Sequence, residues 1–170
     1  TKLDALLPVY LEAFGRWTGA DGGFAPGTSY ALSVLELQMP IWDALRAAMG
    51  VDVYQHPWVS KLPAFLLQFL SNATAIHAFG DGAESVANAP LLYALASRSA
   101  LPAVRAAYLP NLTVQNQSFL FSLTAPFVDE AGTPARASSA HFASIGWASL
   151  RSMETTAPRV ALHFKSSPFG

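Results

Sequence analysis

This chain contains no cysteine, so neither a disulfide framework nor a thiolate zinc site is available to it. Charged side chains are also scarce, because Asp, Glu, Lys and Arg together make up only 12% of its 170 residues. The formal net charge of −1 provides no basic surplus, which argues against binding to nucleic acid or to an anionic membrane. The densest apolar run, residues 62–70, is far shorter than the roughly 20 residues that span a bilayer.

Hydrophobic residues are abundant, at 52% of the sequence, and the mean hydropathy is +0.30. A chain of this length can bury a sizeable core, but it has few charges with which to coat a free surface. We therefore expect it to pack against further protein or to bury its helices on more than one side. Because the first residue lies inside a helical pattern without a signal-peptide layout, we expect a mature or excised segment of a larger protein.

Apolar residues recur at helical spacing in the first two thirds of the chain. The segments that we expect to be helical are 3–14, 30–49, 57–70, 88–100 and 102–108. Thr28 or Ser29 can cap the second helix, and Gly50 is placed to end it. Pro40 should kink or divide that helix, since proline removes a backbone donor and clashes with the preceding turn.

The character of the sequence changes at Pro110. Residues 111–137 contain helix breakers and scattered apolar side chains, which indicates a linker or an irregular crossover. Residues 138–170 are strand-like, and we expect short strands over 142–152 and 159–165, the second of which alternates polar and apolar side chains. Helices that are followed by strands, rather than interleaved with them, favour two segregated layers or domains.

A glycine-rich segment near the start, Asp-Gly-Gly-Phe-Ala-Pro-Gly-Thr-Ser-Tyr, covers residues 21–30. Its glycines at 22, 23 and 27 allow a close backbone approach and left-handed conformations that a Cβ would forbid. The segment places Tyr30 in the first turn of the expected second helix. Backbone donors at the start of a helix favour a nearby anion, such as a sugar carboxylate or a phenolate.

Residues 21–30, 142–152 and 159–170 together resemble the heparinase II/III-like polysaccharide lyases. The resemblance implies a mainly α fold, in which the C-terminal helical hairpins of an (α/α) toroid are followed by the first strands of an antiparallel β-sandwich. The active site of that family lies between the two parts. The implied ranges are 1–109 for part of the toroid, 110–137 for a linker or crossover and 138–170 for the first strands of the sandwich.

The resemblance also implies an activity, which is β-elimination in a uronic-acid polymer such as a glycosaminoglycan or alginate, with Tyr30 as the general acid or base. The substrate carboxylate must be neutralised, a base must remove the α-proton and an acid must protonate the leaving O4. A phenol with a pKa near 10 is a fair acid for an alkoxide, and it needs a cationic or hydrogen-bonding neighbour to act as a base. The chain departs from the family at Pro26, where an acidic residue is frequent, and at Ala31, where an aromatic residue or His is frequent.

Other catalytic groups of the family fall outside this chain. One is a histidine of an Asn-His motif before Thr1, and another His-rich motif follows Gly170, in a downstream domain that holds a structural metal in some members. We therefore expect no cofactor in this chain, and we expect the isolated chain to be inactive. Its partners would be an acidic polysaccharide and the rest of the parent protein, in the periplasm or outside the cell.

Four residues are candidates for substrate binding. Trp17 and Phe24 flank the glycine-rich segment and are candidate sugar-stacking platforms, and Gly27 lies within it. Arg151 could pair with a carboxylate or a sulfate, whose geometry its guanidinium group matches. Trp42, at helical spacing, is expected in the core. The histidines lack the i, i+4 spacing of a helical metal site, and no metal ligand is predicted among them: His56, His77, His141 and His163.

Three other functions stay open on the sequence. A uronyl C5-epimerase could share the scaffold and the proton abstraction, but it would return the proton to the opposite face of the sugar. A non-catalytic glycan-binding module would need only the aromatic and Arg side chains. A purely structural domain would bind no glycan at all. The sequence does not indicate which of heparan, chondroitin, hyaluronan or alginate would be the substrate.

Overall fold

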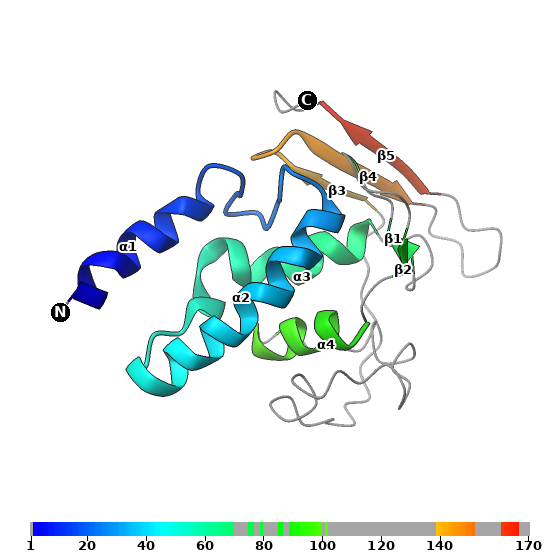
Figure 1. Cartoon of the computed structure of the whole chain (residues 1–170). Helices are drawn as coiled ribbons and strands as arrows, with labels where there is room; N and C mark the ends of the chain where they lie inside the picture. Colours follow the sequence, from blue (N-terminus) through cyan, green and yellow to red (C-terminus); the bar gives the residue numbers. More distant parts are fainter. Residues whose placement is uncertain are drawn as a thin grey trace.

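A computed structural model of the chain describes residues 2–69, 75–76, 79, 85–86, 89–99, 101, 139–151 and 161–166. This part of the chain is mainly helical, with a small three-stranded antiparallel sheet near its C-terminal end (Figure 1). The helical elements are α1 (Lys2–Phe14), α2 (Thr28–Met49), the 3-10 helix η1 (Val53–Gln55), α3 (Pro57–Gln68) and α4 (Ala89–Arg98). The strands are β1 (Ala75–Ile76), β2 (Ser85–Val86), β3 (Ser139–Phe142), β4 (Trp147–Arg151) and β5 (Ala161–Lys165).

The expected mainly helical fold with antiparallel strands at its C-terminal end is confirmed, although the short pair β1–β2 lies between α3 and α4. The helices predicted over 3–14, 30–49, 57–70 and 88–100 all form, with shifts of one or two residues at their ends. The predicted helix over 102–108 and the predicted linker over 110–137 lie outside the described residues. The short antiparallel pair of β1 and β2 was not predicted, because two-residue strands carry no periodic pattern.

Helix α2 is continuous through Pro40, so of the two predicted effects, a kink or a division, the division does not occur. An interior proline costs about 3 kcal/mol, because it removes a hydrogen bond and clashes with the preceding turn. Burial on the opposite face of α2 offsets this cost, since Met39 and Trp42 are fully buried whereas Pro40 is exposed. Gly50 ends the helix as predicted, in the left-handed conformation with φ 68°.

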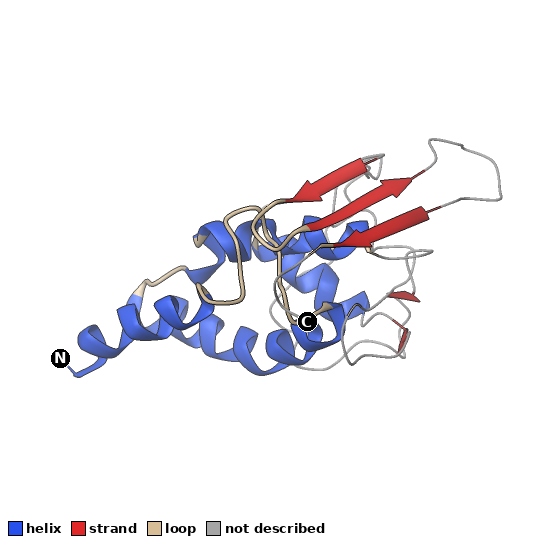
Figure 2. Ribbon diagram, turned by 90° about the horizontal axis from the view of Figure 1, so that it is seen from above, coloured by secondary structure: helices blue, strands red, loops and turns tan. Residues whose placement is uncertain are grey.

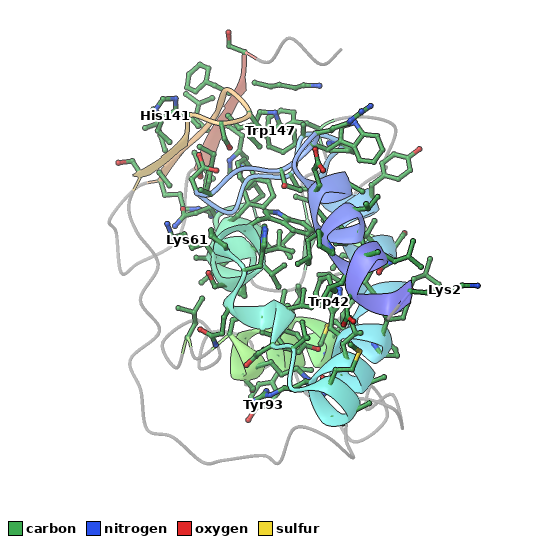
Figure 3. The ribbon with its side chains drawn as sticks, turned by 90° about the vertical axis from the view of Figure 1, so that its left-hand side faces the viewer. Lys2, Trp42, Lys61, Tyr93, His141 and Trp147 are labelled. Carbon is green, nitrogen blue, oxygen red and sulfur yellow. The ribbon has the colours of Figure 1, made fainter. Side chains whose placement is uncertain are left out.

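Aromatic rings fill the core of the helical part. The ring of Trp58 lies 5.1 Å from that of Phe14 and 5.7 Å from that of Phe24. The ring of Trp42 meets that of Tyr54 edge-on at 5.6 Å, and the burial of Trp42 confirms the prediction that it belongs to the core. Figure 3 shows Trp42 among the helices. Because these rings come from α1, α2, α3 and the loops between them, they join the helices into one core.

Helix α1 projects from the rest of the molecule and is attached mainly through its C-terminal half (Figure 1). The hydroxyl group of Tyr10 donates a hydrogen bond to Gln38 and accepts one of 2.8 Å from the indole nitrogen of Trp42. Burial raises the pKa of Tyr10, although the bond from Trp42 opposes this shift. Farther toward the start of α1, Leu6 and Val9 are exposed.

The sheet has the strand order β3-β4-β5 and lies against one side of the helical part (Figure 2). Its inner face packs on α3, where the ring of Trp147 lies 5.7 Å from that of Phe65. Its outer face carries Leu150, Leu162 and Phe164, which are each about half exposed. Leu150 and Leu162 are directly opposite each other, so this face presents a continuous apolar surface.

The sheet differs from the prediction in one respect. The strand predicted over 142–152 forms only over residues 147–151, because a turn over residues 143–146 separates β3 from β4. Gly146 adopts φ 67° in that turn, a conformation that suits glycine. The strand predicted over 159–165 is confirmed over residues 161–165.

A bidentate ion pair connects two helices that are distant in the sequence. On α4, the Nε and Nη2 atoms of Arg98 each donate a hydrogen bond of 2.9 Å to the carboxylate of Asp43 on α2. The hydroxyl group of Tyr54 donates a further bond of 2.9 Å to Asp43. The side chain of Arg98 is only 6% exposed and that of Asp43 is 30% exposed. This pair therefore fixes α4 against α2 in a largely water-excluded setting.

Replacing Arg98 by Met should lower the free energy of unfolding by about 3 kcal/mol, because it leaves a partly buried carboxylate without its cation. Arg46→Met is the matched control. The ion pair of Arg46 with Asp52 spans 3.6 Å, and the Arg46 side chain is 53% exposed. Arg46→Met should therefore lower the free energy of unfolding by less than about 1 kcal/mol. Urea denaturation of both variants measures the difference, and equal losses would contradict the assigned role of the Arg98 pair.

Candidate functional site

The loop between α1 and α2 is a narrow hairpin, which we call the glycine loop (residues 17–27). The backbone nitrogen of Ala25 donates a hydrogen bond of 2.8 Å to the carbonyl oxygen of Trp17. Nearer the tip, the nitrogen of Gly19 donates one of 3.1 Å to the carbonyl oxygen of Gly23. Gly22, at the tip, has φ 92°, a value that side-chain-bearing residues rarely adopt.

The glycine loop is wedged between α3 and the turn that joins β3 to β4. A Cβ atom on Gly22 would lie 2.6 Å from the carbonyl group of Lys61 on α3. A Cβ atom on Gly19 would lie 1.8 Å from Oγ of Ser144 in the β3–β4 turn. The predicted close backbone approach is confirmed, and the groups approached are other parts of this chain. Figure 3 shows Lys61 on α3 in the helical part and Trp147 in the sheet above it.

Asp21 joins the tip of the glycine loop to the sheet. Its carboxylate accepts hydrogen bonds from the backbone nitrogen of Ser144 at 3.1 Å, from Oγ of Ser144 at 2.5 Å and from the backbone nitrogen of Gly23 at 3.0 Å. Partial burial raises the pKa of Asp21, but the bonds from Ser144 and the backbone outweigh it and hold the pKa below its usual value. Asp21 was not predicted from the sequence as a functional residue, although an Asp two positions before a backbone donor is a known turn signal.

Helix α2 begins directly after Gly27, so the prediction that Thr28 or Ser29 caps this helix is wrong. Gly27 has φ 111° and ψ 164°, a region open essentially to glycine alone. A Cβ atom there would lie 2.2 Å from the carbonyl oxygen of Phe79. Gly27 therefore fixes where α2 starts.

Tyr30 is the third residue of α2, and its side chain is 48% exposed. Because the preceding cap is a glycine, no side-chain oxygen from that position covers the start of the helix. The positive end of the helix dipole favours an anion at this end of α2. The structure thus places an accessible phenol at a helix start, as the sequence predicts.

The two residues predicted to stack on sugar rings, Trp17 and Phe24, differ in their exposure to solvent. Trp17 is 54% exposed, and its backbone pairs with Ala25, two residues before Gly27. Phe24 is only 4% exposed, and its ring stacks on that of Trp58 with an interplanar angle of 22°. Phe24 is therefore a core residue whose ring is not accessible to a sugar, and its prediction as a sugar-stacking platform is wrong.

Arg151 is the last residue of β4, and its guanidinium group contacts the C-terminal end of α3. One of its terminal nitrogens donates a hydrogen bond to the carbonyl oxygen of Gln68, which also accepts a bond of 3.2 Å from Oγ of Ser149. A cation at this position is favourable because the C-terminal end of a helix is negative. The hydrogen bond between Ala25 and Trp17 keeps Trp17 near Gly27, three residues before Tyr30, whereas the guanidinium group of Arg151 is bonded to the end of α3.

The described histidines have separate structural surroundings. His56 caps α3, with its Nδ1 atom accepting a hydrogen bond from the backbone nitrogen of Trp58, and burial lowers its pKa. His141 is exposed on β3, and the ring of His163 lies 5.1 Å from that of Phe69. Within the described ranges, no three His, Asp or Glu side chains gather as a metal site would require. His77 lies outside the described residues.

A groove lies between α1 and α2. Its volume is about 210 Å³, and Leu6, Leu7, Tyr10, Ile41 and Leu45 line it. This lining has no charged group, and its one hydroxyl is already bonded within the helical core. The groove therefore lacks the groups that acid-base chemistry needs.

Among the described helices, none combines the length and the apolar character that crossing a membrane would require. A comparison with protein-family models gives no match, and a comparison with curated proteins gives none either.

Replacing Gly27 by Ala should lower the free energy of unfolding by at least about 3 kcal/mol, because the variant meets both an unfavourable φ and the Phe79 carbonyl oxygen. Gly50→Ala is the matched control. Gly50 also has a positive φ, but no atom lies within 4 Å of the new Cβ, so its loss should be about 1 kcal/mol. Urea denaturation measures both, and a Gly27→Ala variant as stable as Gly50→Ala would refute the wedged position of the loop.

Asp21 should make stability depend on pH. Its folded pKa is depressed below 3.8, so its contribution is present above that value and is lost as the pH falls through the folded pKa. Asp21→Asn should lower the free energy of unfolding by about 1 kcal/mol at neutral pH, and the difference should vanish in acid. Carboxyl titration followed by NMR gives the folded pKa of Asp21, and a midpoint at or above 3.8 would contradict the assignment.

Proposed function

We propose that this chain is part of a polysaccharide lyase that cleaves a uronic-acid-containing polysaccharide, such as a glycosaminoglycan or alginate, by β-elimination. The observation that carries the proposal is Tyr30, an accessible phenol at the start of a long helix, delivered there by the glycine loop. The resemblance to heparinase II/III-like lyases in residues 21–30 and in the strand region supports the assignment. The order of a helical part followed by antiparallel strands is compatible with it.

The proposed architecture places residues 1–109 in an (α/α) toroid and residues 138–170 in the first strands of a β-sandwich. Two apolar surfaces support this. Leu6 and Leu37 are exposed on α1 and α2, where further helices of a toroid would cover them. Leu162 and Phe164 are exposed on the outer face of the sheet, where a second sheet would cover them.

In the proposed reaction, a base removes the proton from C5 of the uronate while a hydrogen-bonding or cationic group neutralises its carboxylate. The electron pair forms the C4–C5 double bond, the C4–O4 bond breaks and O4 takes up a proton. Tyr30 can supply that proton as a general acid, and the positive end of α2 favours the phenolate that remains. A histidine from outside this chain would complete the proton transfers, so we expect the isolated chain to be inactive.

Substrate binding is proposed to involve Trp17, whose exposed indole offers a stacking surface beside the loop that leads to Tyr30. Gly27 contributes by setting the start of α2. The proposal does not use Phe24, which is buried, or Arg151, whose guanidinium group binds the end of α3. No step uses a cofactor from this chain, and the polymeric acidic substrate implies a periplasmic or extracellular location.

An exposed Trp17 also suits a non-catalytic glycan-binding module, and a uronyl C5-epimerase would use the same phenol. These alternatives make different products. A lyase leaves an unsaturated sugar end, an epimerase inverts C5 without cleavage and a binding module leaves the polymer unchanged.

Tyr30→Phe in the complete protein should lower kcat by at least about 100-fold, because it removes the proton donor and leaves the ring in place. Tyr10→Phe is the matched control. Its hydroxyl group bonds within the core, so the control should lose stability and keep its turnover. The rate is read as the ultraviolet absorbance of unsaturated uronate on a panel of uronate polysaccharides. Equal turnover of the two variants would remove Tyr30 from the mechanism.

A further inference from the structure

Two different joints hold the glycine loop in place. One is buried, where Phe24 stacks on Trp58 and Gly22 lies against the backbone of α3. The other is at the surface, where Asp21 binds both Ser144 and the loop's own backbone. The buried joint accounts for the attachment of the loop to the helices. The surface joint connects it to the sheet.

The surface joint contributes more to the position of the glycine loop than to the free energy of unfolding. Ser144 is exposed, and a hydrogen bond in such a setting contributes only modestly to the free energy of unfolding. Its geometry is nevertheless closely specified, since the carboxylate of Asp21 accepts two bonds from Ser144, a residue 123 positions away in the sequence. The absence of a side chain at Gly19 is what admits Oγ of Ser144 so close to the loop.

The joint lies on the path between the sheet and the exposed aromatic residues of the proposed site. Asp21 occupies the tip of the hairpin whose base pairs Trp17 with Ala25. The same chain then passes through Gly27 into α2, where Tyr30 lies one turn later. Motion of the tip relative to the β3–β4 turn would therefore change the distance between these aromatic residues and the sheet.

From this arrangement we propose that Asp21 is a positioning residue, which holds the glycine loop against the β3–β4 turn and so fixes Trp17 and Tyr30 relative to the sheet. Its effect on the position of the loop follows from its hydrogen bonds with Ser144 and Gly23. Its effect on turnover rests on the proposed lyase function, in which the site lies between the helices and the sheet. Misplacement of catalytic groups by small distances is costly in rate, which is how a surface contact of modest energy gains importance.

The position of the loop can be tested on this chain without any substrate. In Asp21→Asn, the indole signal of Trp17 and the ring signals of Tyr30 should shift in NMR spectra. The indole signal of Trp42 should stay in place, because it bonds to Tyr10 in the helical core. Ser144→Ala should reproduce the shifts, and Glu12→Gln, which removes the same charge from an exposed site on α1, should cause none.

Three outcomes of this experiment would overturn the inference. The first is that Trp17 and Tyr30 keep their wild-type signals in Asp21→Asn. The second is that Trp42 shifts as much as they do, which would indicate a general loss of structure. The third is that Glu12→Gln has the same effect as Asp21→Asn.

The second experiment measures turnover of the complete protein on uronate polysaccharides. Asp21→Asn should lower kcat/KM by about three- to tenfold, and Asp21→Glu should restore part of the loss. If wild type shows no turnover while the NMR shifts occur, the lyase proposal fails and the positioning role stands. If wild type is active and Asp21→Asn is equally active, the role of Asp21 in the site is refuted.

Discussion

The contact of the glycine loop with α3 and the β3–β4 turn is the constraint on which the rest of the arrangement depends. Four glycines bring backbone so close to neighbouring groups that a single added carbon at any of them would overlap another part of the chain: Gly19, Gly22, Gly23 and Gly27. This contact joins the helices to the sheet, sets the first residue of α2 and leaves Trp17 and Tyr30 at the surface. Each of these consequences follows from the absence of side chains at a few positions.

Scarcity of charge shapes the remainder of the molecule. With 12% charged residues, the chain uses its ionic groups at a few specific joints, such as the bidentate pair of Asp43 and Arg98 between α2 and α4. The exposed faces of α1, α2 and the sheet carry apolar side chains instead. Such faces are expected where further layers of protein pack, and this is why a toroid and a sandwich form part of the proposed function.

Helices and strands could be predicted because apolar periodicity is a local property of the sequence. Pro40 shows where local rules fail, since burial of neighbouring side chains outweighs the cost of an interior proline. Trp17 and Phe24 flank the same loop, but Phe24 is buried because its ring stacks on that of Trp58, a residue distant in the sequence. The bond between Asp21 and Ser144 joins segments far apart in the sequence, so no local pattern could indicate it. The position of Tyr30 at the start of a helix was predictable, because the helix start and the loop before it are both local features.

Analysis of the products that the complete protein forms from uronate polysaccharides tests the central claim most directly. The account predicts shortened chains whose new non-reducing ends carry a C4–C5 double bond, which NMR identifies without reference to any variant. Chains of unchanged length with inverted C5 centres would contradict the claim and indicate an epimerase. Polymers that are bound but chemically unchanged would contradict it as well and assign the exposed aromatic residues to glycan binding alone.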